Sequence, residues 1–177
     1  IAAATPMWKP FSGPIIIDTA KANYVIRSFE ELTKEYSNSA IAFESYFRIG
    51  KIYFSKLNQL SEAKKYFEKI LKDASLSRFA VESSEQLGKI LLIDGNLNQA
   101  KTCYSRIIVN SRASEENRNY AKFQLARISA FEGDFPQAKE KLNNIVANLK
   151  DNTANDAIEL SLLLNTASAD SSNLLKF

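Results

Sequence analysis

The side chains that most often do chemistry in proteins are scarce in this chain of 177 residues, which has no histidine and a single cysteine, Cys103. Without histidine there is no His general base, no Ser-His-Asp triad and no histidine metal ligand. The paired carboxylates Glu30-Glu31 and Glu115-Glu116 point to different sides of a helix, because adjacent helical residues do not face each other. We therefore expect a protein that is not an enzyme and that uses no cofactor and no metal.

Basic side chains at a fixed interval offer a different chemistry. Lys51, Lys89 and Arg127 stand 38 residues apart, and each directly follows a small residue (Gly50, Gly88 and then alanine). Three cations in register can form a ladder only if the chain repeats a structural unit at the same interval. The question is therefore which elements recur with them.

Apolar residues recur at nearly the same step along three further rows. A fixed period of 20–50 residues is typical of a solenoid, in which each unit is stable only when stacked on its neighbours. The small residues would let paired helices approach closely, and the large ones would fill the space between repeats. The rows are Ala63, Ala100, Ala138; Phe67, Tyr104, Leu142; and Ile70, Ile107, Ile145.

Helical spacing of apolar residues runs through most of the chain from Asp18 onward. Ser61 and Ser114 are expected N-caps, and Gly95 and Gly133 are expected to end helices. The pattern predicts an all-α protein of antiparallel helix pairs, with helices near 18–36, 39–56, 61–73, 77–93, 97–109, 115–131, 135–149 and 154–165.

These rows resemble the tetratricopeptide repeat. The closest copy runs from Leu87-Gly88 through Ala100 to Ile107, and the first copy has one extra residue near Asn58. The resemblance implies a right-handed superhelix that acts as a protein-binding scaffold. The 38-residue step exceeds the family's 34. In its longer repeat, the chain is similar to the cell-envelope branch of the family, which includes the Tol-Pal coordinator and the outer-membrane assembly lipoproteins. This implies a periplasmic or envelope location, with the cytoplasm as the alternative.

In this family the first helix of each pair lines a groove. The resemblance therefore implies that the three cations line it together with large apolar residues. Such a ladder would suit an acidic, partly apolar segment of a partner protein. The alternative is that the cations are merely solvated and the apolar residues pack between repeats. The groove candidates are Lys51, Lys89, Arg127, Phe47, Phe54, Leu92, Ile93, Tyr120, Phe123 and Phe131.

Three regions follow from this lattice: a proline-rich arm (1–17), tetratricopeptide-like repeats (18–166), and a tail or the start of a truncated helix (167–177). The repeat pattern begins and ends in the middle of a repeat. This favours either a piece of a longer solenoid or a solenoid whose ends are covered by another molecule. The arm would either cover the first repeat or dock into a partner; its candidate residues are Met7, Trp8 and Phe11.

Three functions compete on this basis. The first is an adaptor that binds a segment of another protein within a larger complex. The second is a permanent structural subunit of a membrane-associated machine, docked through its open ends. The third is RNA binding, against which the net charge of +3 and the lack of a broad basic stripe argue. No stretch has the 18–20 apolar residues of a membrane-spanning helix, so membrane contact is expected only through a complex.

Overall fold

The computed structural model describes residues 18–75, 77–146 and 152–169, and this part of the chain forms eight α-helices and no strand. The expectation of an all-α protein is confirmed. The helices are α1 Thr19–Glu35, α2 Ala40–Ser55, α3 Leu60–Asp73, α4 Ala80–Ile93, α5 Leu97–Val109, α6 Glu115–Phe131, α7 Phe135–Val146 and α8 Asn152–Ala169.

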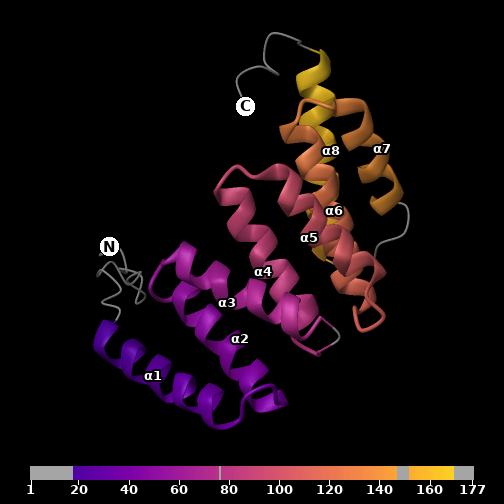
Figure 1. Cartoon of the computed structure of the whole chain (residues 1–177). Helices are drawn as coiled ribbons and strands as arrows, with labels where there is room; N and C mark the ends of the chain where they lie inside the picture. The colour runs from indigo at the N-terminus through magenta and orange to yellow at the C-terminus, as the bar shows by residue number, and fades with distance from the viewer. Residues whose placement is uncertain (1–17, 76, 147–151, 170–177) are drawn as a thin grey trace, which may run out of the picture.

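Each helix packs against the next one in the chain, and the closest contacts are within the pairs α2–α3, α4–α5 and α6–α7. The pairs stack into an elongated solenoid that runs from α1 at one end to α8 at the other (Figure 1). We call α2, α4, α6 and α8 the first helices and α1, α3, α5 and α7 the second helices. The pairing expected from the repeats is confirmed.

Close approach within a pair depends on the small residue before each cation. A Cβ on Gly50 would lie 2.8 Å from the Phe67 ring, and one on Gly88 would lie 2.7 Å from the Tyr104 ring. These distances are shorter than any normal carbon contact, so the aromatic ring occupies the place of the missing side chain. The expected pairing of small first-helix residues with large second-helix residues is confirmed.

The helix ends follow the sequence in most places. Gly95 and Gly133 have φ of 71° and 79°, which glycine adopts without strain. Ser114 caps α6 through a capping box with Asn117. The expectation for Ser61 is wrong, because α3 begins one residue earlier, at Leu60, and its N-terminus has no side-chain cap.

Two expected helix ends also differ from the structure. The helix expected from residue 77 starts at Ala80, because a turn in which Ala80 N–H donates to the Ser77 carbonyl precedes it. α8 extends to Ala169, past the expected end at 165. Neither difference changes the order or the pairing of the helices.

The core follows the repeated rows. The alanine, aromatic and isoleucine rows are almost completely buried, with Ile70, Ile107 and Ile145 at 0%, 1% and 4% exposure. Burial of an aliphatic side chain of this size contributes about 1.5–3 kcal/mol. The core lies in two clusters, a larger one over α2–α6 and a smaller one over α6–α8. Repetition of the same contacts therefore holds the solenoid together.

Both ends of the described solenoid expose apolar side chains. Tyr24 and Val25 are exposed on α1, and Ile158, Leu162 and Leu163 are exposed on α8. Among the described helices, none is long and apolar enough to cross a membrane.

Candidate functional site

The three cations lie on the first helices, beside the contact between paired helices. Because Gly50 faces the second helix, Lys51 points about a quarter-turn away, toward the next first helix. Its ammonium forms an ion pair with Glu82 of α4, with Nζ 3.0 Å from Oε1. Lys89 is related to Tyr120 of α6 by the same 31-residue offset, and its Nζ lies 5.4 Å from the ring centroid.

Every cation of the ladder lies over an aromatic ring. Lys51 lies 5.4 Å from the centroid of Phe47, and Arg127 lies 5.9 Å and 5.6 Å from the centroids of Phe123 and Phe131. Cation–π contacts of this kind contribute about 0.5–1 kcal/mol at exposed sites. We call the surface of the first helices that carries Lys51, Lys89 and Arg127 the ladder face.

The cations also have polar partners within the chain. Lys89 forms an ion pair with Glu85 at 2.6 Å, and Arg127 donates to Gln124 Oε1 at 2.8 Å. Burial is the largest single influence on the pKa of Lys89 and acts to lower it, but the hydrogen bond to Glu85 and the charge interactions with Tyr120 and Glu85 together outweigh it, so the pKa is raised overall. Each of the three cations therefore has a polar partner within the chain, and none is a bare charge facing solvent.

The apolar candidates divide by exposure. Phe47 and Phe123 are buried at 7% exposure, and Phe54, Leu92 and Tyr120 are half-buried against the core. Phe131 and Ile93 are 59% and 63% exposed. The exposed ring of Phe131 is therefore the one best placed to contact another molecule.

A hollow of about 500 Å³ lies at the α1–α2 end of the ladder face, between Val25, Phe29 and the Lys51 side of α2. Phe79 forms one wall and stacks on Phe47, with centroids 5.4 Å apart.

Residues that the sequence did not single out complete this hollow. Glu44 accepts from Arg48 at 2.6 Å and from Arg78 at 2.7 Å, and these hydrogen bonds, the Arg48 bond first, lower the pKa of its carboxyl. Arg78 also covers Phe79 at 4.7 Å from the ring centroid. The signal that could have found this cluster is the 31-residue offset from Lys51 to Glu82, since Phe47 and Phe79 are separated by a similar distance along the chain.

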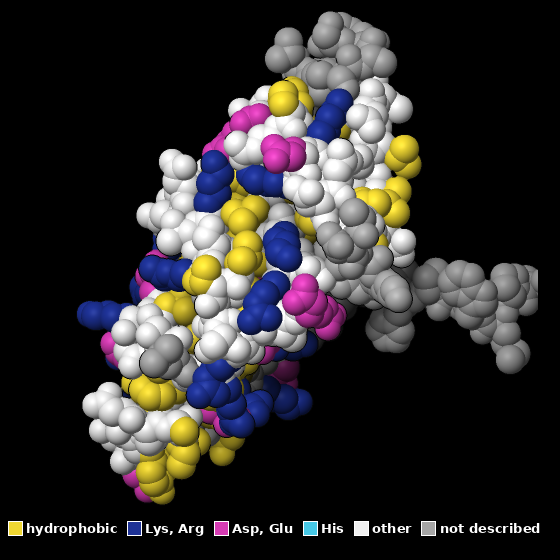
Figure 2. Space-filling model, turned by 90° about the vertical axis from the view of Figure 1, so that its right-hand side faces the viewer, with side chains coloured by type: hydrophobic (Ala, Val, Ile, Leu, Met, Phe, Trp, Pro, Cys, Tyr) yellow, Lys and Arg dark blue, Asp and Glu magenta, His cyan; other side chains and the backbone are white. Residues whose placement is uncertain are grey.

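A smaller hollow of about 330 Å³ lies at the other end, between α6 and α8. Phe123 and Arg127 line it on α6, and Asp156, Glu159 and Leu163 line it on α8. The two ends of the ladder face therefore differ in charge, being rich in arginine and lysine near α2 and acidic near α8. In the view of Figure 2, basic side chains alternate with hydrophobic ones along the length of the molecule.

The remaining candidates from the sequence are Cys103, a metal site and the residues of the proline-rich arm. Cys103 is 3% exposed, and burial raises the pKa of its thiol to about 11, so the expectation that it is packed is confirmed. Among the described residues, no cluster of His, Cys, Asp and Glu could hold a metal ion. Met7, Trp8 and Phe11 lie outside the described residues.

Comparison with known proteins agrees with this geometry. A family model described as tetratricopeptide repeat matches residues 43–72, which span α2 and α3. No curated protein matches the sequence.

Solved structures match nearly the whole chain. A putative kinesin light chain from Podosopora anserina, with nearly identical TPR-like repeats, is 15% identical and has a TM-score of 0.65; the match covers 89% of this chain and 85% of that one. The MamA protein is 17% identical, with a TM-score of 0.60 and coverage of 89% and 83%. The chain has the fold of a TPR-like solenoid. Repeats of this kind generally mediate contacts between proteins and are generally not catalytic.

Proposed function

We propose that this chain is a non-catalytic scaffold that binds a segment of a partner protein on its ladder face. The observation that carries the proposal is the in-register ladder, in which Lys51, Lys89 and Arg127 each lie over an aromatic ring of the first helices. Aromatic side chains and arginine are enriched at protein interfaces, and tyrosine and arginine are among the residues that most often dominate binding energy. Repeated at each first helix, they would hold an extended segment at several points.

The charge difference between the two ends predicts how such a segment lies. Around the hollow near α2, Arg48, Lys51 and Arg78 outnumber Glu44 and Glu82. Complementary charge steers and orients a partner more than it raises affinity. The acidic residues of the segment would lie near α2, and its apolar residues would contact Phe131.

The test uses peptides selected from a random displayed library against the purified chain. We expect acidic peptides with large apolar residues, whose binding is measured by fluorescence polarisation. The variant Lys51→Glu/Lys89→Glu/Arg127→Glu should bind them at least tenfold more weakly. Phe131→Ala should weaken binding severalfold without affecting folding, because the ring is mostly exposed.

A matched control exists on the second helices, where Lys64, Lys101 and Lys139 recur at nearly the same interval. The variant Lys64→Glu/Lys101→Glu/Lys139→Glu changes the net charge equally and should keep its affinity for the peptides. Circular dichroism with thermal unfolding checks that each variant is folded. Equal affinity of both triple variants would refute the ladder face as the binding surface.

A permanent structural subunit is the second candidate function, favoured by the apolar side chains at both ends. Tyr24 is 73% exposed on α1 and Leu162 is 60% exposed on α8. Single apolar side chains on a surface are common, but grouped ones suggest an interface. Sedimentation separates the two functions, since an adaptor should be a monomer at micromolar concentration, whereas a built-in subunit should self-associate or need its partner.

A place in a bacterial cell-envelope complex is the finer part of the proposal. Its support is the long repeat, which is similar in length to the repeats of the envelope branch of the family. Contact with the membrane would then be made by other proteins of the complex. Fractionation of the native cells tests it, and recovery in the cytoplasmic fraction would remove this part alone.

A further inference from the structure

Successive second helices are separated by three gaps, between α1 and α3, between α3 and α5, and between α5 and α7. Two repeat positions face each gap, one near the end of the first helix and one in the middle of the second. Their residues differ from gap to gap, and the pairs are Tyr53 with Tyr66, Leu91 with Cys103, and Ser129 with Lys141.

Tyrosines close the first gap. The rings of Tyr53 and Tyr66 stack with centroids 5.7 Å apart. The Tyr66 hydroxyl then reaches across the gap and donates to Glu30 Oε1 of α1 at 3.0 Å. A phenol ring with a carboxylate acceptor is therefore one way in which this lattice fills the space between two second helices.

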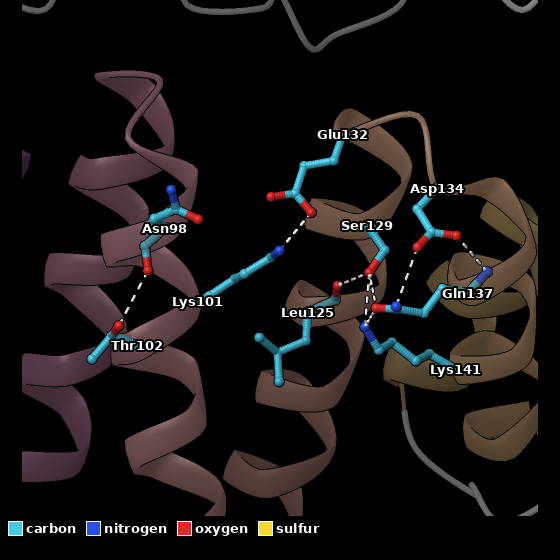
Figure 3. A network of polar contacts seen from close by, with 9 residues as sticks. All are labelled: Asn98, Lys101, Thr102, Leu125, Ser129, Glu132, Asp134, Gln137 and Lys141. Atoms are coloured by element: carbon cyan, nitrogen blue, oxygen red, sulfur yellow. Dashed lines mark hydrogen bonds and ion pairs between the residues drawn. The ribbon is translucent and has the colours of Figure 1, made fainter.

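Hydrogen bonds occupy the same position of the third repeat. Lys141 Nζ donates to Ser129 Oγ at 2.8 Å and also contacts the Gln137 side chain, which accepts from Ser129 at 3.0 Å (Figure 3). On the α5 side, Lys101 reaches Glu132 at 2.5 Å. This network joins α5, α6 and α7 through polar groups that satisfy one another.

The middle gap, between α3 and α5, contains neither stacked tyrosines nor a hydrogen-bond network at these two positions. Leu91 and Cys103 are too small to cross it, and an open pocket of about 490 Å³ remains between α3 and α5. Leu71, Leu87, Leu91 and Cys103 give it an apolar floor. Glu68 lies on its α3 side and occupies the repeat position of Glu30, 38 residues earlier.

The rim of the pocket carries basic charge. Lys72 and Arg106 line it, and within the described part of the chain neither takes part in an ion pair. Glu68, the acidic residue of the rim, lies 3.9 Å from Lys64, a weak contact in which the carboxylate is half-exposed. The pocket therefore combines an apolar floor, a carboxylate acceptor and two unpaired cations.

We propose that the pocket between α3 and α5 docks a tyrosine side chain of a partner protein, whose hydroxyl donates to Glu68 and whose acidic neighbours face Lys72 and Arg106. The inserted ring would take the place that Tyr66 has in the first gap. The docked segment would lie on the second helices, away from the ladder face, so this site does not depend on the function proposed above.

A protein side chain fits this pocket better than a free small molecule. Small-molecule sites usually bury 70–90% of the ligand surface. This pocket opens to solvent between two helices, so it can cover a ring but not a whole ligand. A side chain held by contacts of its own backbone needs only the ring to be covered, and the basic rim can bind its neighbours.

The experiment uses a fluorescent acetylated pentapeptide with a central tyrosine flanked by glutamates, and the same peptide with phenylalanine in its place. We expect the full chain to bind the tyrosine peptide about tenfold more tightly, because a hydrogen bond to a charged acceptor is lost with phenylalanine. Glu68→Gln should reduce this preference. Arg106→Glu should weaken binding of both peptides about tenfold.

Cys103→Tyr installs the residue of the first repeat in the pocket and should weaken binding of the tyrosine peptide at least tenfold. Ser105→Tyr is the matched control, because it adds the same side chain to an exposed position of α5 outside the pocket. If Cys103→Tyr does not fold, the Glu68 and Arg106 variants decide.

Three results would overturn the proposal. They are no binding at millimolar peptide, equal affinity for the tyrosine and phenylalanine peptides, and undiminished binding by folded Cys103→Tyr. The variant Lys51→Glu/Lys89→Glu/Arg127→Glu should bind the tyrosine peptide normally, which separates this site from the ladder face.

Discussion

The middle repeat (α4–α5) and the third repeat (α6–α7) use one backbone lattice with different residues at equivalent positions. Within the pair, the middle repeat packs the fully buried ring of Tyr104 onto Gly88, whereas in the third repeat Leu142 and Ala126 belong to one buried cluster. The larger second-helix residue, Tyr104, is paired with the smaller first-helix residue, Gly88, and the smaller Leu142 is paired with the larger Ala126. Space in this contact is therefore set by the pair of residues and not by either one alone.

On the outer side the two repeats differ in kind. The middle repeat leaves an apolar pocket over Leu91 and Cys103, and the third places the hydrogen bonds of Lys141 and Ser129 at the same positions. The lattice thus fixes where side chains lie, but the side chains decide whether a position is closed. Exchanges between the two repeats test this view.

The largest effect is expected for Gly88→Ala. Its new Cβ would lie 2.7 Å from a ring that cannot move, because Tyr104 is fully buried. Overpacking of this kind costs about 1–3 kcal/mol, and we expect the upper end of that range in urea unfolding. The double variant Gly88→Ala/Tyr104→Leu copies the third repeat and should recover part of the loss.

Ala126→Gly is the control for this exchange. It removes a methyl group from a helix interior and should cost only about 1 kcal/mol. If Gly88→Ala costs no more than that, the close ring contact does not limit packing in the middle repeat.

The next effect is alkaline destabilisation through Cys103. Burial raises its pKa to about 11, above the 9.0 of an exposed thiol, so above pH 9 the unfolded chain loses this proton before the folded one. Its contribution to the free energy of unfolding is complete below pH 9 and is lost between pH 9 and pH 11, by about 2 kcal/mol.

Urea unfolding of the parent and of Cys103→Ala at pH 8 and pH 10.5 measures this loss. Tyr104 and Tyr120, whose pKa values burial also raises, titrate in both proteins, so the difference isolates Cys103. A difference in stability that stays constant across this range would contradict the prediction.

A smaller effect is expected for Lys141→Met, which keeps most of the length of the side chain and removes its donors. The Ser129 hydroxyl can still donate to the Leu125 carbonyl or to Gln137 Oε1, so no buried hydroxyl is left without a partner. We expect a loss of about 1 kcal/mol in urea unfolding. The exposed Lys122→Met on α6 serves as the control and should change stability by less than about 0.5 kcal/mol.

The smallest effect is expected for Lys101→Met, which breaks the ion pair with Glu132 between the middle and third repeats. Both side chains are about one-third exposed, and ion pairs of this kind contribute about 0–1 kcal/mol. We expect a loss of about 0.5 kcal/mol in low salt that disappears in 1 M salt. A loss as large as that of Gly88→Ala would show that the polar network, and not the apolar rows, joins the two repeats.

Much of the fold follows from the sequence, since the period of the apolar rows indicates both the helices and their pairing. The start of α3 could not be located to the residue, and the N-cap predicted at Ser61 is wrong. Leu60 and Ser61 are equally acceptable helix starts, and a one-residue shift leaves the row at Ala63 unchanged. Propensity at a helix end distinguishes such alternatives by only a few tenths of a kcal/mol.

The candidate site was less predictable. The spacing of Lys51, Lys89 and Arg127 indicates a common face but not their neighbours Glu82 and Tyr120, which depend on how successive first helices are rotated. The pocket between α3 and α5 could not be predicted from the sequence either. The sequence shows smaller residues at 91 and 103, but whether helices close around smaller side chains depends on the packing of the whole layer.

The packing of every described helix against its neighbour in the chain has a consequence for how the protein folds. Few contacts require distant parts of the chain to meet, so little loop-closure entropy opposes folding, and proteins of low contact order fold in microseconds to milliseconds. Any pair of helices can form first and recruit the next. The order of folding is therefore set by which pair is most stable locally and not by the position of a central nucleus.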